Sequence, residues 1–427
     1  MSYQRKFFTC CIAWSLAFSA IVASAAQPRE LPTARPEAVG MSSEKMARVT
    51  ESLKGFVEEQ KVAGTIAVVV RKGKVVYFEA FGSRDLEAKK PMEKDSILRF
   101  YSMSKPITTV AAMILVEEGK IDLDADLATY IPEFKQLKVF ESREGNEFKV
   151  KDLVRAVTIR DLMRHTSGLT YGFFGATAID QHYGQVGVLS PTDTLQQTVE
   201  KLGKIPLLYQ PGTRFNYSVS SDVLGHVVEL VSGKNLGDFF QERILGPLNM
   251  TDTAFQVPKE SADRFSNNYS PRAGGGLVVN EAATSSRYLR KPAMCSGGGG
   301  LVSTARDYIR FCQMMLNQGE LDGNRILKAA TVKSMTRDQL PEIAFPISLG
   351  GERPGVGFGL GFSVAVKKPT PSSPLRIGEY GWGGAASTHF WISPKDELAV
   401  VVLSQRMPFT SQLEEAIKPL IYDAIKK

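Results

Sequence analysis

Residues 99–106 read Arg-Phe-Tyr-Ser-Met-Ser-Lys-Pro, and the stretch from Ile107 to Val116 that follows is apolar apart from two threonines. This pattern predicts a buried helix with a proline in its first turn, where a missing N–H costs little, and a glycine stop at Gly119. Ser102 and Lys105 are three residues apart, so a helix brings their side chains to one face. We therefore expect Ser102 at the positive end of this helix and Lys105 in packed surroundings.

A serine and a lysine in this arrangement are suited to nucleophilic catalysis. A serine hydroxyl is a poor nucleophile at neutral pH and needs a base beside it. A lysine that apolar neighbours partly dehydrate has a lowered pKa and can take the proton. The spacing alone is weak evidence, because Ser42 and Lys45 share it and nothing around them indicates chemistry. The alternative for either pair is a helix cap beside a solvated lysine.

Two later segments could complete such a site. Residues 211–219 form a turn that leads into an aromatic stretch with Tyr217, and a phenol beside a lysine ammonium can have its pKa lowered from about 10 and accept a proton. Gly381-Trp382-Gly383-Gly384-Ala385 opens a strand ahead of Thr388, and its glycines would let backbone N–H groups face an oxyanion. The alternatives are a core tyrosine and a kinked edge strand.

Composition and motifs exclude several other chemistries. The chain has no Gly-x-Ser-x-Gly, which argues against an α/β-hydrolase nucleophile elbow. None of its four histidines stands in metal-ligand spacing, so no metal and no cofactor is expected. Basic residues are scattered without interleaved aromatics, so nucleic acid is not an expected partner. His165 lies in Arg-His-Thr-Ser-Gly-Leu, where a helix should run into a turn, and we expect a structural role. The four histidines are His165, His182, His226 and His389.

The N-terminus is typical of an export signal. Arg5 and Lys6 precede a mostly apolar stretch from Phe7 to Val22, and Ala23-Ser24-Ala25 offers a small-residue cleavage site. We predict a signal peptide over residues 1–25, a periplasmic or secreted protein, and no stable membrane span after its removal. Cys295 and Cys312 would remain in the mature chain; one disulfide is possible, although Cys312 is expected to be a buried thiol.

Strand patterns at the two ends of the chain predict the fold class. Two hairpins are expected, the second followed by a helix over residues 413–425, with mostly helical patterns between them. The irregular stretches in the middle are residues 172–191 and 267–292. An α+β fold follows, with one antiparallel sheet built from both termini and flanked by helices. We place the sheet domain at residues 26–109 and 341–427, and a mostly helical inserted region at 110–340. The expected strands are Thr65–Val70, Val75–Phe81, Ser387–Ser393 and Leu398–Gln405.

Together these segments resemble the serine β-lactamase and penicillin-binding-protein superfamily, and within it the family VIII carboxylesterases related to class C β-lactamases. The resemblance covers nearly all of the mature chain from about Pro36. It implies a β-lactamase/transpeptidase-like fold in which Ser102 is the nucleophile and Lys105 and Tyr217 transfer its proton. It also implies an oxyanion hole from the N–H groups of Ser102 and Ala385, with Trp382, Gly383 and Gly384 along the substrate. The motifs that carry it are Ser102-x-x-Lys105, residues 165–169 (His-Thr-Ser-Gly-Leu), residues 211–213 (Pro-Gly-Thr) followed by Tyr217-Ser218, and residues 297–304 (Gly-Gly-Gly-Gly-Leu-Val-Ser-Thr).

Two departures from the superfamily pattern point to the substrate. Val219 stands where Tyr-x-Asn has its asparagine, and Trp382-Gly383-Gly384 replaces Lys-Thr-Gly. The lost lysine would have paired with the carboxylate of a lactam or peptide, and an indole offers an apolar wall instead. We therefore expect a serine hydrolase for short-chain carboxylic esters, with weak β-lactam hydrolysis still open.

Other functions remain possible on the same residues. They are a true β-lactamase or D-alanyl carboxypeptidase, an acyltransferase to an alcohol other than water, and an inactive peptidoglycan-binding or scaffold protein. The expected partner is a small-molecule ester or β-lactam. The sequence does not indicate an oligomeric state.

Overall fold

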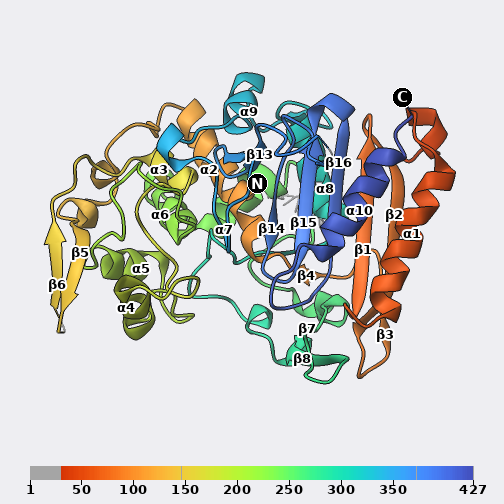
Figure 1. Cartoon of the computed structure of the whole chain (residues 1–427), viewed down its shortest axis with the longest axis horizontal. Helices are drawn as coiled ribbons and strands as arrows, with labels where there is room; N and C mark the ends of the chain where they lie inside the picture. The colour runs from red at the N-terminus through yellow and green to blue at the C-terminus, as the bar shows by residue number, and fades with distance from the viewer. Residues whose placement is uncertain (1–29, 146, 372, 427) are drawn as a thin grey trace, which may run out of the picture.

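The computed structural model describes residues 30–145, 147–371 and 373–426, and its centre is an eight-stranded antiparallel sheet (Figure 1). The strand order is β12-β13-β14-β15-β16-β1-β2-β3. The N-terminal and C-terminal parts of the chain therefore share one sheet, which confirms the predicted α+β class and architecture. The strands are β1 (Gly64–Arg71), β2 (Lys74–Asp85), β3 (Lys90–Pro91), β12 (Val356–Phe358), β13 (Ser363–Ala365), β14 (Tyr380–Gly384), β15 (Thr388–Ser393) and β16 (Leu398–Leu403).

The two predicted hairpins meet at the middle of this sheet. β1 pairs with β16 from Ile66 opposite Leu403 to Arg71 opposite Leu398. The β1–β2 turn places Lys72 and Gly73 at φ +49° and +73°, the conformation that matches the twist of a two-residue hairpin. Ile66 and its alternate neighbours face the large core shared with the helical region, whereas the residues between them face a second core.

Helices cover both faces of the sheet. α1 (Ser43–Glu58) and α10 (Gln412–Asp423) pack together on one face, where Met46, Val49, Leu53, Leu413 and Ile417 join the second core. α8 (Ala305–Leu316) packs against β1 and β16 on the other face. Figure 1 shows the remaining helices gathered beside the sheet, around α2.

The region between the hairpins, as far as it is described, carries α-helices joined by irregular segments, together with four small two-stranded sheets. Its other α-helices are α2 (Ser104–Glu117), α3 (Ile159–Met163), α4 (Ala178–Val186), α5 (Leu195–Leu202), α6 (Ser220–Ser232), α7 (Leu236–Phe240) and α9 (Ala329–Met335). The small sheets pair β4 (Leu98–Arg99) with β9 (Val302–Ser303), β5 (Val139–Glu144) with β6 (Glu147–Lys151), β7 (Asn268–Pro271) with β8 (Leu277–Glu281), and β10 (Glu320–Leu321) with β11 (Asn324–Arg325). The predicted boundaries at residues 110 and 341 stay predictions.

Two stretches expected to be irregular contain regular structure. Residues 172–191 include α4, which begins at a capping box in which Thr177 and Asp180 bond each other's backbone. Residues 267–292 include the β7–β8 hairpin, whose strands are joined by Gly274, Gly275 and Gly276, all at positive φ. Both elements are short, so their hydrophobic periodicity is too weak to stand out from the loops around them.

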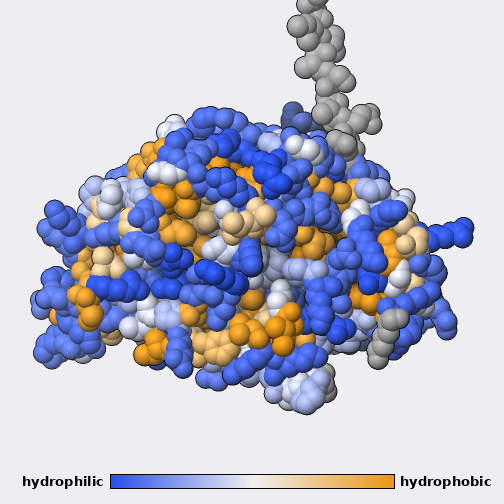
Figure 2. Space-filling view, turned by 90° about the horizontal axis from the view of Figure 1, so that it is seen from above, coloured by the Kyte–Doolittle hydropathy of each residue, from blue (hydrophilic) through white to orange (hydrophobic). Residues whose placement is uncertain are grey.

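The face seen in Figure 2 is largely hydrophilic, with hydrophobic residues in separate patches. Within the described ranges, no helix is long and apolar enough to cross a bilayer. The predicted signal peptide lies outside the described residues. Cys295 and Cys312 are both unpaired thiols, and Cys312 is fully buried, as expected.

Candidate active site

Ser102 lies in a short 3₁₀ helix, Tyr101–Met103, that runs directly into α2. Tyr101 has φ +43°, a sharp turn that ends the approach from β4. The Phe100 N–H bonds the Leu301 carbonyl and the Leu301 N–H bonds Ser104 Oγ, so the segment is held against the glycine-rich stretch 297–301. Ser102 remains partly exposed at the start of the helix, where a substrate can reach its hydroxyl.

Lys105 is 1% exposed and reaches three groups with its amine. Nζ lies 3.2 Å from Ser102 Oγ, 2.8 Å from the Tyr171 hydroxyl and 2.6 Å from the Gly298 carbonyl. Burial lowers the pKa of Lys105 to about 7, although the negative charge of Asp222 partly opposes that shift. Near neutral pH a large share of this amine is therefore unprotonated and can accept a proton from Ser102.

Tyr217 completes the group that the sequence predicted. Its hydroxyl is hydrogen-bonded to Ser102 and, at 3.3 Å, accepts from Trp382 Nε1. Lys105 Nζ lies 4.6 Å from the centroid of its ring. The expectation of a lowered phenol pKa is wrong: burial raises the pKa of Tyr217 above 10, because the cost of burying a phenolate exceeds the benefit of these two hydrogen bonds.

The segment of His165 positions Tyr217. His165 is buried, its ring centroid lies 4.8 Å from that of Tyr217, and its Nδ1 is 3.4 Å from Ser218 Oγ. The Asn216 N–H donates to the His165 carbonyl, and the Asn216 side-chain amide donates to the Leu169 carbonyl. Burial holds the pKa of His165 well below its ordinary value. These contacts agree with the structural role expected for His165.

The predicted strand lies beside the serine. β14 packs against the 3₁₀ helix of Ser102, and a Cβ on Gly384 would collide with the Phe100 carbonyl, so only glycine permits this approach. Trp382 is 7% exposed and its ring packs 5.3 Å from that of Tyr217. Gly383 follows on the same strand, and Ala385 begins the turn after it. All of the predicted site residues thus lie in one region.

The second Ser-x-x-Lys has no such surroundings. Ser42 is the N-cap of α1, where its side chain accepts the Lys45 N–H. The Lys45 amine is 46% exposed and bonds Asp423 at 3.1 Å. This pair is a helix cap beside a solvated lysine, in contrast to Ser102 and Lys105.

Sequence reasoning did not predict that Tyr171 bonds Lys105, and it missed Asp222. Tyr171 follows the His-Thr-Ser-Gly-Leu motif and bonds Lys105, but its distance along the chain gave no sign of that contact. Asp222 is buried on the first turn of α6 and accepts from Ser296 Oγ at 2.5 Å and Gly298 N at 3.0 Å. Its position five residues after Tyr217 was the one available signal.

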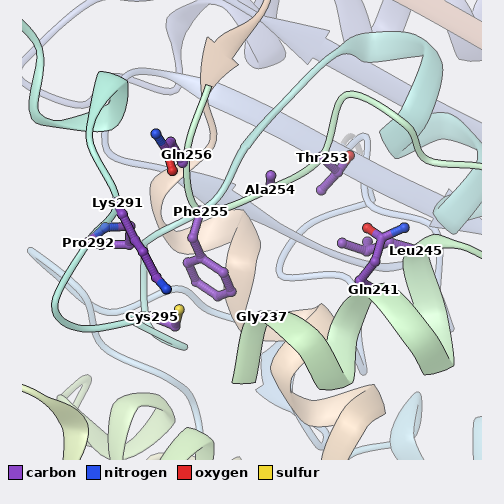
Figure 3. Close-up of a pocket in the computed structure, with 10 residues that line it drawn as sticks. All are labelled: Gly237, Gln241, Leu245, Thr253, Ala254, Phe255, Gln256, Lys291, Pro292 and Cys295. Carbon is purple, nitrogen blue, oxygen red and sulfur yellow. The ribbon is translucent and has the colours of Figure 1, made fainter. Parts of the chain in front are cut away.

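A separate cavity of about 200 Å³ is lined by residues of α7 and of the segments 253–256 and 291–295 (Figure 3). Phe255 and Cys295 line it, and Phe255 packs so closely on Gly300 that a Cβ there would lie 2.7 Å from the ring. Across the part of the chain that the structure describes, no group of three His, Cys, Asp or Glu side chains could hold a metal ion.

Comparison with known proteins places this geometry in a family. A model of the β-lactamase family matches residues 49–420. An uncharacterised protein of Mycobacterium tuberculosis is 35% identical over 353 residues, covering 81% of this chain and 86% of that protein. Esterase EstB of Burkholderia gladioli is 29% identical over 401 residues, covering 87% of this chain and 94% of EstB.

A solved structure agrees with the sequence comparisons. EstCE1, described as a hydrolase with promiscuous acyltransferase activity, superposes with a TM-score of 0.76 at 27% identity, covering 88% of this chain and 98% of EstCE1. The fold, the family model and these relatives agree with the resemblance predicted from the sequence. This chain belongs to the β-lactamase family and is one of its serine hydrolases.

Proposed function

We propose that this protein is a carboxylesterase that cleaves short-chain esters through an acyl-enzyme on Ser102. The observation that carries the proposal is the convergence of one hydroxyl, one amine and one phenol: Lys105 and Tyr217 are buried beside the partly exposed Ser102, and Lys105 Nζ lies 3.2 Å from Ser102 Oγ. The similarity to EstB, which is described as an esterase, supports ester hydrolysis, and the similarity to EstCE1 supports hydrolase activity in general.

Acylation begins with proton transfer from Ser102 to the neutral amine of Lys105. Ser102 Oγ attacks the ester carbonyl carbon, and the carbonyl π electrons move onto its oxygen. When that tetrahedral intermediate collapses, the bond to the alcohol oxygen breaks and Tyr217 donates its proton to the leaving alcohol. Lys105 then returns a proton to Tyr217, which leaves the amine neutral again. Because burial raises the pKa of Tyr217, the phenol is protonated near neutral pH and has a proton to donate.

Deacylation repeats these steps with water in place of the alcohol. Tyr217 and Lys105 together accept the water proton as its oxygen attacks the acyl carbon, and Ser102 regains its proton when the acid leaves. The N–H groups of Ser102 and Ala385 are assigned to the oxyanion in both steps, supported by the close packing of β14 on the serine segment.

The lining of the site favours a neutral, apolar substrate. Trp382 stands where a lysine would bind a substrate carboxylate, and its ring continues a row of aromatic contacts through Tyr217 to Phe174 and Phe173. The carboxylate of a lactam or of a peptide terminus finds no charge-assisted hydrogen bond at this aromatic wall, whereas a neutral ester has no carboxylate that needs one. This contrast argues against β-lactamase or D-alanyl carboxypeptidase as the main activity.

Acyl transfer to a second alcohol is the alternative that a specific observation favours. EstCE1 is described as both a hydrolase and an acyltransferase. The same acyl-enzyme serves both outcomes, and the choice depends on whether water or an alcohol reaches it. Ethanol or butanol added to the assay would give the exchanged ester as a second product if transfer occurs.

A substrate panel with a nucleophile control tests the proposal. Short-chain nitrophenyl esters, a chromogenic cephalosporin and a D-alanyl-D-alanine peptide are offered to the wild type and to Ser102→Ala. Esters should be cleaved fastest, and Ser102→Ala should lose turnover and labelling by a fluorophosphonate while keeping its unfolding temperature. Retained esterase activity in Ser102→Ala, or faster lactam cleavage, would overturn the assignment.

We also propose that residues 1–25 direct export. The support is their order of charge, apolar stretch and small residues, ending at Ala23-Ser24-Ala25. Expression of the full chain in a Gram-negative host should yield a periplasmic protein whose N-terminus begins after residue 25. A cytoplasmic product that keeps Met1 or Ser2 would contradict this.

A further inference from the structure

The glycine-rich stretch is fixed between two helices. On the α2 side, Thr108 Oγ1 donates to the Gly297 carbonyl at 2.7 Å. On the α6 side, Asp222 Oδ1 accepts both Ser296 Oγ and the Gly298 N–H. The carbonyl of the same Gly298 accepts Lys105 Nζ at 2.6 Å. The residue whose carbonyl binds the Lys105 amine is thus held in place through its own N–H, which donates to Asp222 Oδ1.

Glycine is required for this close approach. A Cβ on Gly298 would collide with Asp222 Oδ2 and would lie 3.0 Å from the Tyr171 hydroxyl. A Cβ on Gly297 would lie 2.6 Å from the Ser221 carbonyl. The sequence therefore brings the loop backbone into direct contact with Asp222 where any other residue would push them apart.

Burial of Asp222 needs a reason beyond packing. The residue is 1% exposed in a mostly apolar helix, and burying a carboxylate costs several kcal/mol unless other groups compensate for the lost hydration. Two hydrogen bonds, the start of α6 and the charge of Lys105 offset part of that cost, but burial still raises the pKa of Asp222 above its ordinary value. The negative charge of Asp222 in turn favours the protonated form of the Lys105 amine.

We propose that Asp222 is a positioning residue for the base: through Ser296 and Gly298 it fixes the carbonyl that orients Lys105, and its charge sets how readily Lys105 holds a proton. This inference rests on the proposed serine acylation, in which neutral Lys105 takes the proton of Ser102.

Several groups face Lys105 from the surrounding elements. Ser102 and Tyr171 bond its amine, and the amine lies over the Tyr217 ring. Buried His165 is near enough that a charged Lys105 disfavours protonation of the imidazole. Tyr171, Tyr217 and His165 stay neutral near pH 7, because burial raises the pKa of both phenols and lowers that of the imidazole. Asp222 is therefore the group whose substitution should move the titration of Lys105.

The test is the pH profile of kcat/KM for Asp222→Asn, measured with a nitrophenyl ester in a pH-stat. Asparagine keeps Oδ1 as an acceptor for Ser296 and Gly298, removes the charge, and puts an amide NH2 in place of Oδ2. Without the carboxylate, the protonated form of Lys105 is less favoured. The acid limb of the profile, where kcat/KM falls as the pH is lowered, should therefore move about one unit to lower pH, which is a tenfold change in the Lys105 protonation equilibrium. The plateau rate should fall about tenfold as well, because a weaker base accepts the serine proton less readily.

Asp307→Asn is the matched control. Asp307 is also a buried carboxylate, 1% exposed, that accepts a backbone N–H and a hydroxyl, but it lies at the start of α8. Burial raises its pKa to about 7, so it could produce a limb in the same range. Its substitution should leave the limb in place, whereas a limb that moves in Asp307→Asn and not in Asp222→Asn would overturn the inference.

A milder variant covers the case in which Asp222→Asn fails to fold. Ser296→Ala removes one hydrogen bond to Asp222 from a partly exposed position, and it should move the limb in the same direction by less and lower the plateau several-fold. Unmoved limbs in every foldable variant would overturn the role of Asp222. If a fluorophosphonate does not label Ser102 in the wild type, the proposed function itself is overturned, so the two failures are distinguishable.

Discussion

At the scale of the residue, burial separates a catalytic pair from a structural one. Ser42 and Lys45 repeat the spacing of Ser102 and Lys105, yet the Lys45 amine is hydrated and paired with Asp423 at the surface. Lys105 is enclosed, and the free energy of burying an ammonium lowers its pKa to about 7. Spacing brings a base to the serine, and dehydration makes that base usable near neutral pH.

The pH dependence of turnover follows from Lys105. Its pKa is lowered in the fold, so the reactive neutral amine predominates above about pH 7 and the inactive ammonium below. We expect kcat/KM for an acetate ester to rise through an apparent pKa of about 7 and then level off, measured in a pH-stat from pH 5 to 9. Lys105→Arg should lose this activity, because a guanidinium stays protonated throughout. A flat profile would contradict Lys105 as the base.

Tyr217→Phe should reduce kcat by roughly 10²–10⁴-fold, the usual contribution of a positioned general acid or base. The ring packing against Trp382 and His165 stays in place, so the unfolding temperature should change little. Tyr183→Phe is the control, because Tyr183 is also buried but lies on α4, and this variant should keep full activity. A near-wild-type rate in Tyr217→Phe would remove the phenol from the mechanism.

At the scale of the element, the sequence predicted those parts that local patterns encode. The hairpins of β1–β2 and β15–β16 and the helices α1, α2 and α10 follow from alternation and helical periodicity. The bond of Tyr171 to Lys105 and the effect of the Asp222 charge on it could not be predicted, because both depend on how separate segments of the chain pack. The phenol pKa of Tyr217 was misjudged for a related reason: the depth of burial is a property of the assembled site.

The loop after Tyr171 should set substrate preference. Phe173 and Phe174 are 64% and 60% exposed, yet they pack on each other, on Tyr171 and, through Phe174, on Tyr217. Large aromatic side chains at the mouth of a site gain free energy when an apolar ligand covers them. Phe173→Ala and Phe174→Ala should therefore lower kcat/KM about tenfold for esters with a long apolar chain, such as a hexanoate, and by less than about threefold for ethyl acetate.

Two ester series identify which end of the substrate meets this loop. One varies the acyl chain on a fixed nitrophenol, and the other varies the alcohol of a fixed acetate. Leu86→Ala, an exposed apolar residue on the β2–β3 turn, should change neither series. Equal losses for all esters in the Phe173 and Phe174 variants would mean that the loop does not select the substrate.

At the scale of the whole molecule, the site depends on a sheet that the two ends of the chain build together. Ser102 follows the N-terminal hairpin, whereas Trp382 and Ala385 lie about 280 residues later on the strand and turn before β15. β14 is held in place through β15 and β16 by the pairing of β16 with β1. The serine and its proposed oxyanion groups meet only when this central pairing has formed.

Leu403→Ala tests that dependence. Leu403 is fully buried where β16 pairs with Ile66 of β1, so removal of its side chain should cost about 2–5 kcal/mol of unfolding free energy in urea titrations. Leu230→Ala, at a position 47% exposed on α6, should stay within about 0.5 kcal/mol of the wild type. Because the sheet joins both halves of the site, fluorophosphonate labelling of Ser102 and the tryptophan fluorescence signal should be lost at the same urea concentration in each variant. Labelling that persists after the fluorescence transition would mean that the serine site is formed by the helical region alone.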